Sequence, residues 1–128
     1  MKPRETALRF KRFEADEQAR KVADLEQMVR EFESIASDLD RQIHAEEERT
    51  GVRDPAHFAY STFAKSAAQR RDNLRASADE LKMKLDVATR EKEATNEQLA
   101  RAAIVEPRDQ TDRSRPRAGD RPAGFVGR

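Results

Sequence analysis

Apolar residues recur at seven-residue intervals along two long stretches of the chain. A repeat sustained at this interval is typical of coiled-coil helices rather than of an isolated amphipathic helix. The first stretch contains Leu8, Ala15, Val22, Val29, Ala36 and Ile43, with Leu25, Phe32 and Leu39 three residues after its central members. The second contains Tyr60, Ala67, Leu74, Leu81, Ala88, Thr95 and Ala102, and Arg71 and Lys92 interrupt an accompanying series of Ala64, Ala78, Leu85 and Leu99. We call the surface formed by these residues the seam.

Glycine and proline interrupt residues 4–105 at one place only. Gly51 has the position of a glycine that ends a helix, and Asp54–Pro55 has the pattern of an N-cap followed by the first helical residue. We therefore predict helices at about 4–49 and 55–105, joined by a turn at 50–54. So short a connection makes the helices antiparallel. The predicted fold class is all-α, an antiparallel coiled-coil hairpin within residues 1–105.

The predicted turn also bears on the register of the two helices. One register pairs Val22 with Leu81, and another, shifted by one heptad, pairs Val22 with Ala88. Both registers place large side chains against small ones equally well. We favour the first register, because a second helix that begins at Asp54–Pro55 leaves few residues to span the turn.

Residues 106–128 differ in composition from the rest of the chain. They contain three prolines, three glycines and six arginines, and they lack an apolar period. We predict that this Arg/Pro/Gly tail is disordered when the protein is alone.

Composition narrows the range of chemistry. Of the 128 residues 40% are charged, yet the formal net charge is only +1, which favours long helices over general disorder. The absence of cysteine excludes disulfides, zinc–thiolate sites, iron–sulfur clusters and thiol nucleophiles. No apolar run approaches the roughly 18 residues of a membrane span, and no signal peptide is expected. We expect a cytoplasmic protein.

The sequence contains no strong catalytic motif. No phosphate-binding loop, dinucleotide fingerprint or zinc-protease motif occurs. The run Glu46–Glu48 fits a solvated helix end better than a metal or acid–base site, because adjacent side chains point around a helix. His44 and His57 flank the turn and could approach each other, but no third ligand has a clear spacing. We predict that the protein is not an enzyme and needs neither metal nor cofactor.

Nucleic-acid binding is a further alternative. Arg70, Arg71 and Arg75 cluster in the second stretch, and the tail is rich in arginine. Asp72 and Asp79 dilute the first group, and neither group has interleaved aromatic residues for base stacking. We therefore expect no dedicated nucleic-acid site.

An aromatic cluster follows the predicted turn. Phe58, Tyr60 and Phe63 fall within six residues, and one opposing helix is too thin to bury all three. The cluster either closes the end of the hairpin or docks a partner, since exposed aromatic side chains are typical anchors. We assign Tyr60 to closing the hairpin and Phe58 to docking, and both interpretations stay open for Phe63.

Two segments resemble a known family. The residues Arg4–Phe13, and above all Asp54–Ala64 continuing to Gln69–Leu74, look like the FliJ-type flagellar export proteins, in particular their short alphaproteobacterial branch. The resemblance covers roughly residues 4–104. It implies an antiparallel coiled-coil hairpin similar to the central stalk of rotary ATPases.

The resemblance also implies a function. Such proteins are soluble components of the flagellar type III export apparatus, peripherally associated with its membrane-embedded part and not inserted in the membrane. They insert into the ring of the export ATPase, touch the cytoplasmic domain of the export gate protein and escort export chaperones. The family's gate contact begins at a Tyr-x-x-Phe pattern, and we expect the contact here to involve Phe58, Tyr60, Phe63, Ala67, Arg70 and Leu74. The alternatives are a generic coiled-coil scaffold or a nucleic-acid-associated protein that uses its Arg-rich tail.

Overall fold

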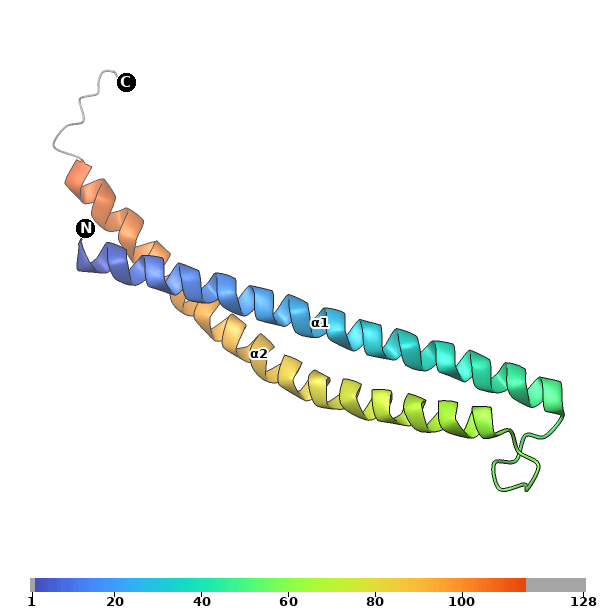
Figure 1. The fold of residues 1–128 in the computed structure, drawn as a ribbon. Coiled ribbons are helices and arrows are strands. Elements are labelled where there is room, and N and C mark those ends of the chain that lie inside the picture. The colour runs from blue at the N-terminus through green and yellow to red at the C-terminus, as the bar shows by residue number, and fades with distance from the viewer. Residues whose placement is uncertain (1, 115–128) are drawn as a thin grey trace, which may run out of the picture. The chain divides into compact units, whose positions relative to one another are not determined.

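The computed structural model describes residues 2–114, with the side chains of residues 2–104, and this part of the chain forms two long helices. Helix α1 comprises Pro3–Thr50 and helix α2 comprises Thr62–Ser114. No strand occurs among the described residues. The helices follow each other as an antiparallel hairpin (Figure 1), which confirms the predicted all-α fold class.

Helix α1 ends at the predicted glycine. Gly51 has a φ of 76°, a left-handed conformation that glycine adopts without a Cβ penalty. Its amide donates a hydrogen bond of 2.8 Å to the carbonyl of Glu47, which satisfies one of the unpaired carbonyls of the last turn.

Helix α2 does not begin at Pro55, and this part of the prediction is wrong. The carboxylate of Asp54 accepts the amide of Ala56 at 2.9 Å instead of capping a helix. The carbonyl of Asp54 accepts the amide of His57, and the carbonyl of His57 accepts the amide of Tyr60, each at 3.0 Å. Residues 54–60 therefore form two consecutive turns. An Asp–Pro pair suits such a turn as well as a helix start, because aspartate bonds its own backbone two residues on.

Ser61 caps α2 in place of Asp54. Its hydroxyl accepts the amide of Ala64 at 3.2 Å, and its carbonyl accepts the amide of Lys65 at 3.0 Å as the first helical bond. The cap therefore lies one heptad later than predicted, and the connection comprises residues 51–61 rather than 50–54.

The far end of α2 also differs from the prediction. The helix continues to Ser114, whereas the predicted helix ends at about residue 105. The remainder of the predicted tail, residues 115–128, lies outside the described residues.

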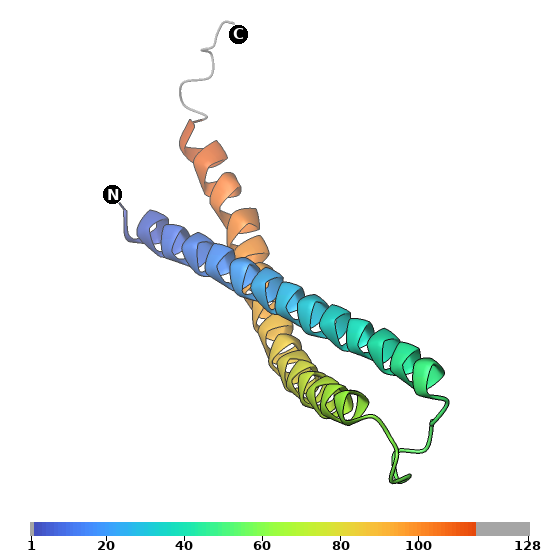
Figure 2. The same cartoon turned by 45° about the vertical axis from the view of Figure 1, so that its right-hand side comes forward.

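The helices contribute to two compact units. Of the described residues, unit 1 comprises 2–17 and 91–114, and unit 2 comprises 18–90. In unit 2 the second half of α1 and the first half of α2 run side by side (Figure 2).

The seam predicted from the heptads forms the core of unit 2. One cluster contains Val22, Leu25, Val29, Leu81 and Ala88, with Phe32 and Leu85 packed against it. A second cluster contains Leu39, Ile43, Ala64 and Ala67, with Tyr60, Ala68 and Leu74 packed against it. Many of these side chains are alanines, so the helices approach closely but bury modest apolar area.

The register is the second of the two alternatives, and the one favoured from the sequence is wrong. Leu74 packs against the cluster that contains Leu39 and not against the one that contains Val29, and Arg71 pairs with Asp40. The cause is the connection, because a cap that lies one heptad later shifts α2 by one heptad along α1.

Unit 1 has a smaller core. Leu8 and Ala15 of α1 are buried, as is Thr95 of α2, while Leu99 is half-buried. These positions continue the predicted seam, although one of the four side chains is polar.

Candidate functional site

The carboxylates at the end of α1 hold the connection in place. The hydroxyl of Ser61 donates to Glu46 Oε2 at 2.6 Å, and the hydroxyl of Tyr60 donates to Glu47 Oε2 at 2.7 Å. Arg53 pairs with Glu48. The prediction that Glu46–Glu48 form a solvated helix end is wrong for Glu46 and Glu47, since both are half-buried. The hydroxyls at positions 60 and 61 were the signal, but their partners depend on the path of the connection.

The ionisation of these groups follows from their hydrogen bonds. Arg49, whose Nε lies 2.8 Å from Glu46 Oε1, and then Ser61 lower the pKa of Glu46 to about 2. The hydrogen bond to Glu47 raises the pKa of Tyr60, because the phenol must keep its proton to donate it. At neutral pH the Glu46 carboxylate is therefore ionised and the Tyr60 hydroxyl is protonated, as their hydrogen bonds require.

The connection presents an aromatic pair to solvent. Phe58 is 96% exposed and stacks on His57, with ring centroids 4.7 Å apart and an interplanar angle of 23°. The Nδ1 atom of His57 accepts the amide of Ala59 at 3.0 Å, which orients the imidazole. The prediction that Phe58 remains accessible is confirmed.

The two histidines contact different neighbours. Nδ1 of His44 lies 3.7 Å from Glu47 Oε1, whereas His57 contacts Phe58 and Ala59. Among the side chains of residues 2–104, no cluster of three or more is arranged to hold a metal ion.

The predicted gate-binding face is divided by the fold. Phe63 is 54% exposed, and Arg70 is exposed as well. Ala67 is buried in the core, and Tyr60 and Leu74 are half-buried against it. The role of Tyr60 in closing the hairpin is thus confirmed. Phe58, Phe63 and Arg70 remain the accessible members of the predicted face, and we call them the docking residues.

Two of the three clustered arginines are engaged with α1. Arg71 Nη1 lies 2.8 Å from Asp40 Oδ1, and Arg75 pairs with the other oxygen of the same carboxylate. The hydrogen bond from Arg71, followed by that from Arg75, lowers the pKa of Asp40. A further interhelical pair joins Lys82 to Glu33 at 2.6 Å. The interruption of the seam by Arg71 is thereby explained as an ion pair.

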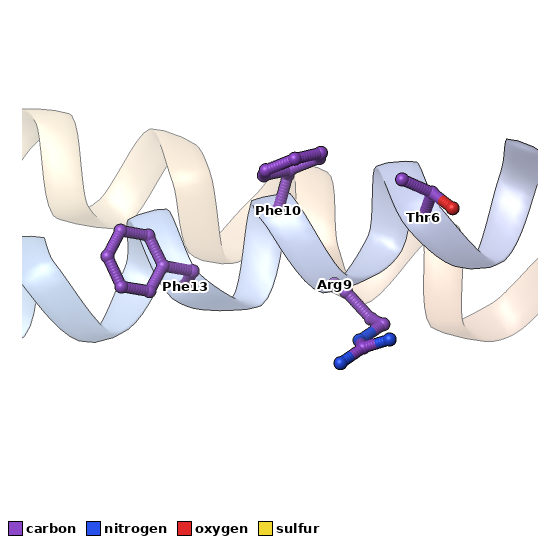
Figure 3. A pocket seen from close by; sticks show the side chains of 4 residues that line it. All are labelled: Thr6, Arg9, Phe10 and Phe13. Atoms are coloured by element: carbon purple, nitrogen blue, oxygen red, sulfur yellow. The ribbon is translucent and has the colours of Figure 1, made fainter.

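A second exposed aromatic surface lies in unit 1. Phe10 and Phe13 are 71% and 62% exposed. Together with Thr6 and Arg9 they line a shallow pocket of about 400 Å³ on α1 (Figure 3). These phenylalanines are not among the site residues predicted from the sequence. The signal was their position two and five residues after Leu8, outside the heptad series.

Comparison with known proteins gives no relative. No family model, no curated protein and no solved structure matches the chain. Within residues 2–114, neither helix has a stretch apolar and long enough to cross a membrane.

Proposed function

We propose that this chain is a FliJ-type stalk and adaptor of flagellar type III protein export. In this role it links the export ATPase ring to the export gate and escorts export chaperones, in the cytoplasm at the membrane-embedded apparatus. The proposal rests on the resemblance of residues 4–104 and is consistent with the helical hairpin.

The observation that carries the proposal is the exposure of Phe63 beside an ordered connection. Phe63 lies in the first turn of α2, and Arg70 lies seven residues further along the same side of the helix. The neighbouring seam residue Ala67 packs against α1, so the fold does not need Phe63 for its core. A half-exposed phenylalanine at a capped helix start is suited to anchoring a partner, because its backbone is already fixed and little conformational freedom is lost on binding.

The nucleic-acid alternative has less support. Arg71 and Arg75 are paired with Asp40, which leaves Arg70 as the member of that arginine cluster that forms no ion pair with α1. A generic scaffold remains the alternative if the expected export partners do not bind.

Binding of the full chain to the cytoplasmic domain of the export gate tests the proposal. Truncating an anchor typically costs at least about 2 kcal/mol, so Phe63→Ala should weaken gate binding roughly thirtyfold while binding to the export ATPase persists. Met83→Ala is the matched control, because Met83 is an exposed apolar residue of α2 outside the docking residues. Circular dichroism checks that each variant stays helical.

Each other outcome has a definite meaning. Wild-type affinity in Phe63→Ala would remove Phe63 from the gate site. Loss of helicity in that variant would show that Phe63 closes the hairpin instead of docking. Failure of the unmodified chain to bind either the gate domain or the ATPase would overturn the export assignment.

A further inference from the structure

The two sides of the hairpin in unit 2 differ in chemistry. On one side Glu33 and Asp40 of α1 form ion pairs with basic residues of α2. Relative to the seam residue Val29, Glu33 is rotated by about 50° in one direction and Met28 by about 100° in the other. Met28 and Ile35, one heptad apart, are 40% and 36% exposed. Charged side chains therefore close one side of the seam, while the other side leaves apolar side chains in water.

A groove lies between the helices on this apolar side. It has a volume of about 330 Å³ and is lined by Lys21 and Leu25 from α1 and by Met83, Lys84 and Val87 from α2. Leu25 is a residue of the core, whereas Val87 is 47% exposed. The floor of the groove is therefore part of the hydrophobic core, and exposed side chains form its rims.

Helix α1 carries a second apolar stripe that extends from this groove along the same side. Its members are separated alternately by three and four residues and are Leu25, Met28, Phe32, Ile35 and Leu39. Three of them also belong to the seam, so the directions of the second stripe and of the seam differ by about 50°. Three helices that all contact one another require about 60° between two such directions. The second stripe is therefore placed to contact a third helix that lies beside α1 and α2.

A row of carboxylates follows the outer edge of the second stripe. Asp24, Glu31 and Asp38 recur every seven residues, each one position before a member of the stripe, and all three are exposed. Asp38 pairs with Arg41, whereas Asp24 and Glu31 form no ion pair with another described residue. Charged residues that flank an apolar stripe in this way determine which helices pair with it. A helix that fills the groove should therefore carry basic residues on the flank that faces the row.

The other charged residues near the groove do not favour one sign. Lys21 and Lys84 belong to its lining, and Glu80 lies one heptad before Val87 on α2. The preference for a basic flank thus applies to the edge formed by α1 and not to the edge formed by α2.

We propose that this groove binds an amphipathic helix of another protein, which places apolar residues at heptad spacing on the second stripe and basic residues beside Asp24 and Glu31. Unit 2 then becomes a three-helix bundle. A second copy of the chain fits less well, because antiparallel packing of the two second stripes brings the carboxylate rows together. The Arg/Pro/Gly tail lacks the apolar period that the stripe requires. The inference does not depend on the export assignment.

Fluorescence anisotropy with two labelled synthetic peptides and the full chain tests this inference. Both peptides are helices of about 18 residues, long enough to cover the second stripe, with leucine at alternating spacings of three and four. They differ only at the flank that meets the carboxylate row, which carries lysine in one peptide and glutamate in the other. We expect the lysine peptide to bind at least about tenfold more tightly at low salt, and the ratio to fall at high salt because exposed charges are screened.

Two double variants locate the binding surface. Met28→Ser combined with Ile35→Ser should weaken binding of the lysine peptide at least about tenfold, because two apolar side chains no longer contact it. Asp24→Lys combined with Glu31→Lys should reverse the preference, so that the glutamate peptide binds more tightly. Circular dichroism checks that each variant stays helical.

Matched controls change exposed residues outside the groove. Phe10→Ser combined with Phe13→Ser removes two exposed apolar side chains of α1. Asp16→Lys combined with Asp86→Lys changes the net charge as much as the reversal beside the second stripe does. Both controls should bind the two peptides as the unmodified chain does.

Several results would overturn the inference. Equal affinity for the two peptides would remove the charge argument, and absence of binding by both would remove a helix as the occupant. Undiminished binding by a helical Met28→Ser, Ile35→Ser variant would place the site elsewhere. If that variant unfolds, the exposed carboxylates decide, and an unchanged preference after Asp24→Lys with Glu31→Lys would contradict the site. In sedimentation velocity, a dimer of the unmodified chain that the serine variant converts to a monomer would show that a second copy fills the groove.

Discussion

Replacement of Leu81 by alanine is the sharpest test of the observed core. Leu81 is 9% exposed and belongs to the cluster that contains Val22, Leu25 and Val29. Leucine-to-alanine changes in protein cores cost about 2–5 kcal/mol, through lost apolar burial and the cavity that remains. In unit 2 only two helices enclose the site, so water reaches part of the vacated space. We therefore expect a loss of about 2–3 kcal/mol in the free energy of unfolding.

Urea titration followed by circular dichroism measures this loss. Met83→Ala is the control, since Met83 lies two residues further along α2, is 69% exposed and should change stability by no more than about 0.5 kcal/mol. A loss below about 1 kcal/mol in Leu81→Ala would contradict its place in the seam. Equal losses in the two variants would show that helix propensity, and not core packing, determines the effect.

Two further predictions concern the connection. Ser61→Ala removes the hydroxyl that caps α2 and donates to Glu46, so we expect the free energy of unfolding, measured by urea titration, to fall by about 1 kcal/mol. Ser61→Thr should keep most of this stability, and equal losses in the two variants would contradict the cap. Because hydrogen bonds from Arg49 and Ser61 lower the pKa of Glu46 from 4.5 to about 2, the ionised carboxylate contributes stability above about pH 4.5 that is lost as the pH falls towards about 2. Glu46→Gln should flatten this part of the pH profile of stability, and an unchanged slope would refute the role assigned to Glu46.

The seam was predictable because its signal is repeated. Val22, Val29, Ala36 and Ile43 recur every seven residues, and all four are buried. Each repeat confirms the same face of the helix, so an error at one position changes little. The end of α1 was predictable for a different reason, since Gly51 occupies a conformation that other residues rarely adopt.

The start of α2 was not predictable from local preference. Asp54–Pro55 is compatible with a helix start and with a turn, and Ser61 is compatible with a cap. The hydrogen bonds from Tyr60 and Ser61 to Glu47 and Glu46 distinguish these arrangements, and they join residues 13 and 15 positions apart. Such contacts depend on the path of the whole connection.

The candidate site was predictable only in part. The aromatic cluster indicated correctly that some aromatic surface remains exposed, because one opposing helix cannot cover every ring. Phe58 was expected among the exposed residues, whereas Phe63, which is 54% exposed, was left open. The family resemblance places Ala67 and Leu74 on the gate-binding face, yet their heptad positions place them against α1. The exposed surface at Phe10 and Phe13 was not predicted, because the heptad repeat identifies the buried side of a helix and not the opposite side.

The register itself shows what a heptad pattern leaves undecided. A shift of one heptad keeps every seam residue in the seam, so apolar periodicity alone does not distinguish the alternatives. The ion pairs between the helices do not distinguish them either. Arg71 and Arg75 meet Asp40 in the observed register, and a shift by one heptad would place Glu33, another carboxylate, at the same level. The hydrogen bonds at the connection do distinguish the two registers. Ser61 donates to Glu46 in the observed register, whereas the shift would place Leu39, which has no side-chain acceptor, at that level. A polar contact beside a coiled-coil seam can thus specify a register that the apolar repeat leaves open.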